Sequence, residues 1–284
     1  MSETTANKPT VEMRAVKVTS LADVSQVVLS EVNWSVHPGD FWVVAGAQHS
    51  GKSDLLMHAA GLTTPLAGEC SVFGIDTREF DETQISERLR MGFAFSGGKL
   101  FNQHTVAENV ALPLRYHREL PDEETAKFVE ELLELLGLAQ FASVTPGNLP
   151  PAWRQRAALA RALVLKPEML LLDNPNGGLI SRHRQWLVEF LDRLWQGHPF
   201  FGGRPMTIVA TTDDLPMWRH PRRKFAAVHE GTFSILGGWG GDAFRSHQAI
   251  NELLFGANET DEAKADNGEN TQKAGAAAST EKRN

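Results

Sequence analysis

The chain has 284 residues, 42% of them hydrophobic, and a formal net charge of −7. This apolar share excludes a wholly disordered protein, and the acidic balance argues against a nucleic-acid-binding protein, because a negative surface repels phosphate backbones. No stretch approaches the roughly 18 consecutive apolar residues that a membrane-spanning helix needs.

The two ends of the sequence differ from its middle. Residues 1–11 are polar and hold no apolar core for a signal peptide, and we expect them to be flexible. Residues 257–284 contain no Val, Ile, Leu or aromatic residue, which predicts a disordered tail. The lone Cys70 cannot form an intramolecular disulfide. Together these features predict a cytoplasmic protein.

Between residues 12 and 256, short apolar runs alternate with longer amphipathic stretches, and this alternation predicts one α/β domain. Two runs, MLLLD at 169–173 and MTIVATT at 206–212, are apolar on both faces. Strands buried inside a parallel sheet have this character, so we expect both runs to be central strands.

The most specific motif follows the apolar run at 41–45, which a Pro-Gly turn precedes. The motif fits G-x-x-x-x-G-K-[ST] in full and leads into a helix-like run that starts with Asp54. Its backbone N–H groups would wrap phosphate oxygens, Lys52 would contact the terminal phosphates, and Ser53 would bind magnesium. The candidate nucleotide-binding residues are therefore Gly46, Ala47, Gln48, His49, Ser50, Gly51, Lys52, Ser53 and Asp54. A glycine-rich turn with a solvated lysine is the alternative.

Farther along, the amphipathic stretch RQRAALARALVL at 154–165 leads into a buried run that ends at Asp173. Here the sequence resembles the ATP-binding subunits of ATP-binding cassette (ABC) transporters, over about residues 12–255. The resemblance implies a P-loop NTPase fold of the ABC ATPase type, an α/β fold in which helices flank a parallel or mixed sheet. It also implies a helical subdomain over roughly residues 100–165. Residues 92–124 closely resemble the ATPases of Mla-type phospholipid transporters.

The resemblance also implies cofactors and partners. The cofactors would be ATP and Mg²⁺, with Ser53 and Asp173 as the magnesium ligands. The partners would be an integral membrane permease and a second ABC subunit, either another copy or a different chain, and no nucleic acid. The protein would then lie in the cytoplasm, peripheral to the inner membrane through its permease.

Several positions depart from the family pattern. Ser96 stands where the family has its Q-loop glutamine, Thr212 replaces the switch histidine, and Ile180 replaces the D-loop aspartate. Asn174 replaces the carboxylate that polarises the attacking water, and an amide cannot accept a proton as a carboxylate does. Loss of a general base typically costs about 10²–10⁴-fold in rate. The Leu-Ser-Gly-Gly-Gln signature aligns with residues 149–153, in which two prolines lack the backbone donor that would cradle phosphate.

Four other features each admit more than one interpretation. Asp213 and Asp214 form either a solvated turn or, through a shifted loop, a substitute base. Trp153, at the signature position, either packs within the chain, plugs the opposite site or anchors a dimer. The basic run HPRRK at 220–224 is either a solvated turn or a contact for phospholipid or a partner. No aromatic residue lies near Ser20 and Leu21, where the family stacks adenine, so base affinity is either weak or supplied elsewhere.

Three functions remain in competition. The first is an ATP-binding subunit of a membrane transporter with a lipid-linked cargo, which binds nucleotide but hydrolyses it slowly or not at all. The second is an active transport ATPase with a non-standard base. The third is a scaffold or regulatory protein that keeps the ABC fold without transport.

Overall fold

Short apolar runs form the parallel centre of the sheet. In the computed structural model, which describes residues 8–80, 84–117 and 121–255, ten strands make one sheet in the order β5-β4-β1-β2-β10-β9-β3-β8-β7-β6. Five neighbouring strands are parallel: β9 (Lys224–His229), β3 (Phe41–Ala45), β8 (Thr207–Thr212), β7 (Met169–Leu172) and β6 (Met91–Ala94). The two runs expected to be central strands, β7 and β8, are direct neighbours, which confirms the prediction.

Side chains of these strands alternate between two cores, because successive residues of a strand point to opposite faces. On β3, Phe41, Val43 and Ala45 face a core that contains α5 and α6. The intervening Trp42 and Val44 face a second core that contains α1. Both faces of the parallel strands are therefore buried, which explains why their sequences lack the polar alternation of half-exposed strands.

An antiparallel arm closes the second core. It consists of β1 (Val11–Thr19), β2 (Val27–Val36), β4 (Ala67–Val72) and β5 (Ile75–Asp76). A parallel bridge joins β2 to β10 (Thr232–Gly238), which pairs antiparallel with β9. Helix α1 (Lys52–Ala59) packs its buried Leu55, Leu56 and Ala59 between arm and parallel strands, so the start of this helix has a fixed position at the sheet edge.

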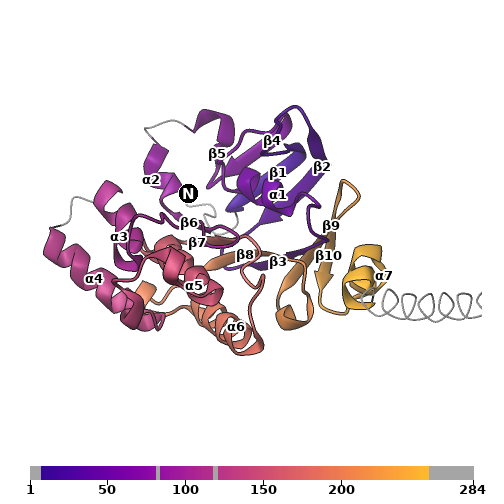
Figure 1. Cartoon of the computed structure of the whole chain (residues 1–284). Coiled ribbons are helices and arrows are strands. Elements are labelled where there is room, and N and C mark those ends of the chain that lie inside the picture. The colour runs from indigo at the N-terminus through magenta and orange to yellow at the C-terminus, as the bar shows by residue number, and fades with distance from the viewer. Residues whose placement is uncertain (1–7, 81–83, 118–120, 256–284) are drawn as a thin grey trace, which may run out of the picture.

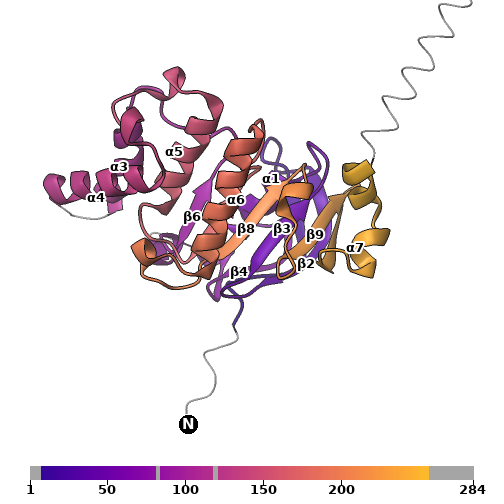
Figure 2. The ribbon, with the colours of Figure 1, turned by 90° about the horizontal axis from the view of Figure 1, so that it is seen from below.

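Helices cover the other face. Figure 1 shows α3 (Val106–His117), α4 (Asp122–Leu135) and α5 (Pro151–Leu163) gathered at one end of the sheet and α7 (Asp242–Ser246) at the other. Helix α6 (Ser181–Gln196) lies alongside β8 in Figure 2, and the short α2 (Ile85–Arg88) precedes β6. Apolar residues of α4 and α6 recur at helical spacing, so each helix buries one stripe in the core.

The architecture confirms the predicted α/β class. The expected helical subdomain at roughly 100–165 contains α3, α4 and α5. The expected disordered tail at 257–284 lies outside the described residues, as do residues 1–7 of the expected flexible start. Within that start, the N–H of Thr10 donates to the carbonyl of Val36, and β1 begins at Val11. None of the described helices combines the length and apolar character needed to cross a membrane.

Close packing of β6 against α5 gives a stability prediction. A Cβ on Gly92 would press against the backbone carbonyl of Ala162, which cannot move without shifting α5. We expect Gly92→Ala to lower the free energy of unfolding by about 1–3 kcal/mol, as overpacking does. Gly147→Ala is the control, because a Cβ there meets nothing within 4 Å. Equal stability of the two variants in urea denaturation would contradict this packing.

Candidate nucleotide-binding site

The glycine-rich loop crosses the carboxyl edge of β3 and ends in the first turn of α1. Only glycine fits at position 46, where a Cβ would lie 2.5 Å from the Val228 carbonyl oxygen, and Gly51 has a φ of 97°. Because the first N–H groups of a helix have no intrahelical acceptors, the start of α1 offers free donors. These donors and the helix dipole favour an anion at this point. The loop lines a hollow of about 430 Å³.

Lys52 folds back onto the loop that it follows. Its Nζ donates to the carbonyl oxygens of Gly46 (2.8 Å) and Ala47 (2.6 Å). Burial lowers the pKa of this ammonium, while Asp213 and Asp173 act in the opposite direction. A terminal phosphate entering the loop would supply a stronger acceptor than the two carbonyls, since hydrogen bonds between charged groups are stronger than neutral ones.

A hydroxyl and a carboxylate meet beside the lysine. Ser53 Oγ lies 2.9 and 3.0 Å from the two carboxylate oxygens of Asp173, and Thr211 Oγ1 donates to the same carboxylate at 3.0 Å. These are hard oxygen ligands, and Mg²⁺ commonly takes one or two such groups together with substrate phosphates. Ser53 and Asp173 therefore fit the predicted magnesium pair. Thr211 was not identified from the sequence, where a threonine inside an apolar strand gives no functional signal.

Asn174 is the second residue after β7 and has a positive φ of 42°. Its N–H donates to Thr211 Oγ1 at 2.9 Å, which ties this backbone to β8. Its side-chain Oδ1 is buried and, within the described residues, has no hydrogen-bond partner. The side chain lines the same hollow as the loop, so the amide stands at the site without the proton-accepting power of a carboxylate.

Thr212, the last residue of β8, and the two aspartates that follow it have three different surroundings. Thr212 is fully buried, and its hydroxyl bonds to Asn176 Oδ1 (3.2 Å) and to the carbonyl of Asp214 (2.9 Å). The carboxylate of Asp214 pairs with Arg184 on α6. The carboxylate of Asp213 instead lies 3.3 Å from Gln48 Nε2 and lines the nucleotide hollow. The two neighbouring aspartates therefore have different surroundings.

Other predicted positions also differ in where they lie relative to the hollow. Ser96 is exposed and lines the hollow, whereas Ile180 is 65% exposed at the N-cap of α6. Asp54 also lines the hollow, and its carboxylate accepts a hydrogen bond from the N–H of Leu21 at 2.7 Å. That bond joins the segment after β1 to the start of α1.

The two signature prolines begin α5. Pro150 is the N-cap and Pro151 occupies the first helical position, so neither supplies an N–H. The N–H groups of Trp153 and Arg154 both bond to the carbonyl of Pro150, at 3.0 and 3.1 Å. The start of this helix is therefore much poorer in free donors than the start of α1.

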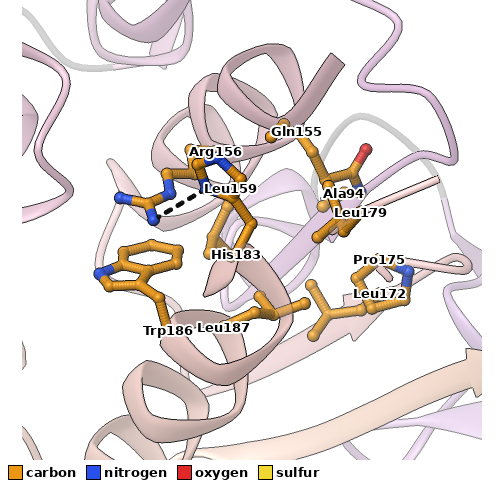
Figure 3. A pocket seen from close by; sticks show the side chains of 11 residues that line it. Ala94, Gln155, Arg156, Leu159, Leu172, Pro175, Leu179, His183, Trp186 and Leu187 are labelled. Carbon is orange, nitrogen blue, oxygen red and sulfur yellow. Dashed lines mark hydrogen bonds between the residues drawn. The ribbon is translucent and has the colours of Figure 1, made fainter. Parts of the chain in front are cut away.

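Trp153 packs within its own chain. Its ring lies 4.8 Å from that of Phe141, and the Arg156 guanidinium sits between the rings of Trp153 (4.7 Å) and Trp186 (3.5 Å). Figure 3 shows Arg156 over Trp186, with its hydrogen bond to His183 Nδ1 at 3.3 Å. Burial lowers the pKa of Arg156 to about 10. This cluster connects α5 to α6 and was not found from the sequence, because its members lie on separate helices.

The basic run at 220–224 is not a simple solvated turn. Arg223 is buried, pairs with Asp192 and lies over the ring of Phe41. Lys224 donates to Asp40 at 2.7 Å, and Arg222 lies 4.9 Å above the Trp195 ring. The interpretation as a solvated turn is wrong for the buried Arg223, whereas Arg222 is exposed, as in such a turn. Arg223 and Lys224 hold the end of α6 and the start of β9 against β3.

Comparisons with known proteins agree with this geometry. The ABC transporter family matches residues 29–177. The chain belongs to the family of ABC transporter ATP-binding proteins. It is 30% identical over 248 residues to the methionine import ATP-binding protein MetN of Chlamydia pneumoniae, covering 84% of this chain and 70% of that protein. It is 35% identical to the sulfate/thiosulfate import ATP-binding protein CysA of Mycobacterium tuberculosis, but spans only 57% of its length.

Two further proteins are similar to this ABC protein. The lipoprotein-releasing system ATP-binding protein LolD of Bordetella pertussis is 38% identical over 169 residues, 59% of this chain and 73% of that protein. The dimeric, post-hydrolysis structure of the ATP-binding cassette MJ0796 with ADP and phosphate is 28% identical, with a TM-score of 0.70. It covers 81% of this chain and all of that chain, and it confirms the ABC ATPase fold.

The hydrogen bond between Arg156 and His183 makes the free energy of unfolding depend on pH. His183 Nδ1 accepts from Arg156 only when the ring is neutral, and burial, followed by Arg156 and Arg182, lowers its pKa from the ordinary 6.5. The stabilisation that this hydrogen bond gives is complete above pH about 6.5. It is lost as the pH falls further, because the unfolded chain then binds a proton at His183 more readily than the folded chain does. We expect thermal unfolding of the wild type to lose more stability between pH 7.5 and 5.5 than His183→Gln. Identical losses would contradict this.

The packing of Trp153 in the ABC fold gives a second prediction. Replacement by alanine removes the aromatic contact with Phe141 and one face of the Arg156 sandwich. We expect Trp153→Ala to lower the free energy of unfolding by about 2–4 kcal/mol, since the ring is partly exposed and large-to-small changes of buried Trp cost about 3–5 kcal/mol. Tyr116→Ala is the control, because Tyr116 is 82% exposed. A loss no greater than that of the control would contradict the packing role.

Proposed function

We propose that this ABC transporter subunit binds Mg-ATP through the loop at 46–54 and hydrolyses it slowly or not at all. Its nucleotide occupancy would then regulate or hold together a transporter complex. The proposed cofactors are ATP and Mg²⁺, with Ser53 and Asp173 at the metal. This function separates two tasks of the site, holding phosphate and activating water.

Binding is supported by the complete phosphate loop. The backbone donors at the start of α1, the ammonium of Lys52 and the Ser53–Asp173 pair all line one hollow. None of these groups depends on the positions where the sequence departs from the family. The loop can therefore hold phosphate whether or not water is activated beside it.

Slow turnover is supported chiefly by Asn174. Hydrolysis needs a group that takes the proton of the attacking water, and the side chain at this position is an amide. Thr212 cannot replace the missing histidine, because its hydroxyl is buried and already bonded to Asn176 and Asp214. The helix start at Pro150 and Pro151 offers few donors to a phosphate held by another subunit.

An active ATPase is the second candidate, and one observation favours it. Asp213 is a carboxylate that lines the nucleotide hollow and contacts Gln48 of the loop. A base must stand within hydrogen-bond reach of the water, directly or through one further water. Asp213→Asn separates the two candidates, because it would abolish turnover only if this carboxylate is the base.

The proposed partners are a membrane permease and a second ABC subunit, which would place the chain at the cytoplasmic face of the inner membrane. MetN and CysA are named as import ATP-binding proteins, and the MJ0796 cassette is dimeric, which supports this assembly. A lipid-linked cargo is supported by the resemblance of residues 92–124 to Mla-type ATPases. Co-purification of a permease would support transport, whereas a complex without one would favour a scaffold.

The first experiment titrates the full chain with Mg-ATP in a calorimeter and follows phosphate release in the same sample. We expect binding, with turnover well below about 1 per second, the lower end of typical enzymes. Lys52→Ala should weaken binding by about tenfold or more, because hydrogen bonds to charged groups contribute about 1.5–3 kcal/mol. Lys127→Ala, an exposed lysine of α4, removes the same charge and should leave binding unchanged. Turnover of several per second that disappears in Lys52→Ala would overturn the proposal.

A single restored carboxylate should not recover full activity. Asn174→Glu supplies a base, but Thr212 and the proline start of α5 remain unchanged. We expect phosphate release by Asn174→Glu to stay far below that of an intact ABC ATPase assayed in parallel. Full activity of this variant would assign the whole defect to position 174.

A further inference from the structure

A second hollow lies at the opposite edge of the sheet from the phosphate loop. It measures about 580 Å³ and is formed by the segments that enter β1, β3, β6, β7 and β8, together with the turn after β4. The phosphate loop follows the far end of β3, a strand of five residues, so about 17 Å of strand separates the two edges. Among the described residues, none lines both hollows.

The charge of this hollow is opposite to that of the protein. Lys8, Arg90, Lys166 and Arg204 line it, and among the described lining residues Glu168 is the one carboxylate. Arg90 donates twice to Glu168, at 2.9 Å each, and also pairs with Glu87 outside the lining, so its charge is fully balanced. Within the described residues, the other three cations make no ion pair. Three positive charges from three segments therefore gather on a chain of net charge −7.

Aromatic contacts hold part of this lining in place. The Arg90 guanidinium lies 3.8 Å above the ring of Phe73. The Lys166 ammonium lies 4.9 Å from the ring of Phe128 and 5.6 Å from that of Phe200. The positions of two cations are thus fixed by packing, and the volume falls within the range of about 300–1,000 Å³ found for small-molecule sites.

We infer that this hollow binds a small polyanion that carries at least two phosphate or carboxylate groups. A neutral ligand would leave the charges of Lys8, Lys166 and Arg204 without a counter-charge, and a cation would be repelled. A guanidinium such as that of Arg204 grips phosphate or carboxylate through paired hydrogen bonds, while Lys8 and Lys166 supply point charges. The inference does not depend on the proposed function, because it uses none of the residues of the phosphate loop.

The test uses the full chain carrying Lys52→Ala, so that the phosphate loop is weakened as a competing site. Inorganic pyrophosphate and citrate are titrated separately in a calorimeter at low ionic strength, where exposed charges are least screened. We expect one site, weakened about tenfold or more by adding Lys166→Gln and Arg204→Gln. Adding Arg219→Gln and Arg245→Gln, two exposed arginines outside the hollow, removes the same charge and should change the affinity less than about twofold.

Each result assigns or overturns the site. Binding of pyrophosphate alone identifies a phosphate-bearing ligand, binding of citrate alone identifies a polycarboxylate, and binding of both means that charge and spacing suffice. Absence of binding for both probes would overturn the inference. Equal weakening by the two double replacements would also overturn it, because affinity would then follow net charge instead of the hollow. Circular dichroism and thermal unfolding confirm that each variant is folded.

Discussion

The parallel register of β3, β8 and β7 is the constraint on which the site depends. Ala45 pairs with Thr212, and Leu172 pairs with Ala210, so these strands end at the same edge of the sheet. That edge brings the phosphate loop together with Asp173, about 120 residues later in the chain. The strands are buried on both faces, and this burial prevents them from sliding, because a shift of one residue would exchange the two cores.

At this edge, the groups that hold phosphate are built differently from the groups that would activate water. Phosphate would be held by backbone donors, which any sequence with the right glycines supplies, and by one ammonium. Water activation needs particular side chains, and here Thr212 is buried and bonds to Asn176, while Asn174 brings to the hollow an amide that cannot accept a proton as a carboxylate does. The side chains that activate water can therefore be absent while the geometry of the phosphate loop remains intact.

The sequence was sufficient for the features that rest on local chemistry. The glycine-rich motif and the strands at 169–172 and 207–212 follow from residue type and periodicity, and the structure agrees. Contacts between distant segments could not be read in this way. The sequence places Asp213 and Asp214 side by side, yet only the packing of α6, which supplies Arg184, separates one carboxylate from the other. The burial of Arg223 in the basic run at 220–224 was missed for the same reason.

The start of α5 shows what the chain has instead of a phosphate-binding signature. A helix start that grips phosphate needs free N–H groups and little bulk around them. Here Pro150 and Pro151 remove donors, and Trp153 brings a large ring that packs against Phe141 and Arg156. Arg156 in turn donates to the Leu136 carbonyl, which follows α4. The first turns of α5 therefore combine two prolines that reduce the number of N–H donors with a tryptophan and an arginine that fix the helix to its neighbours.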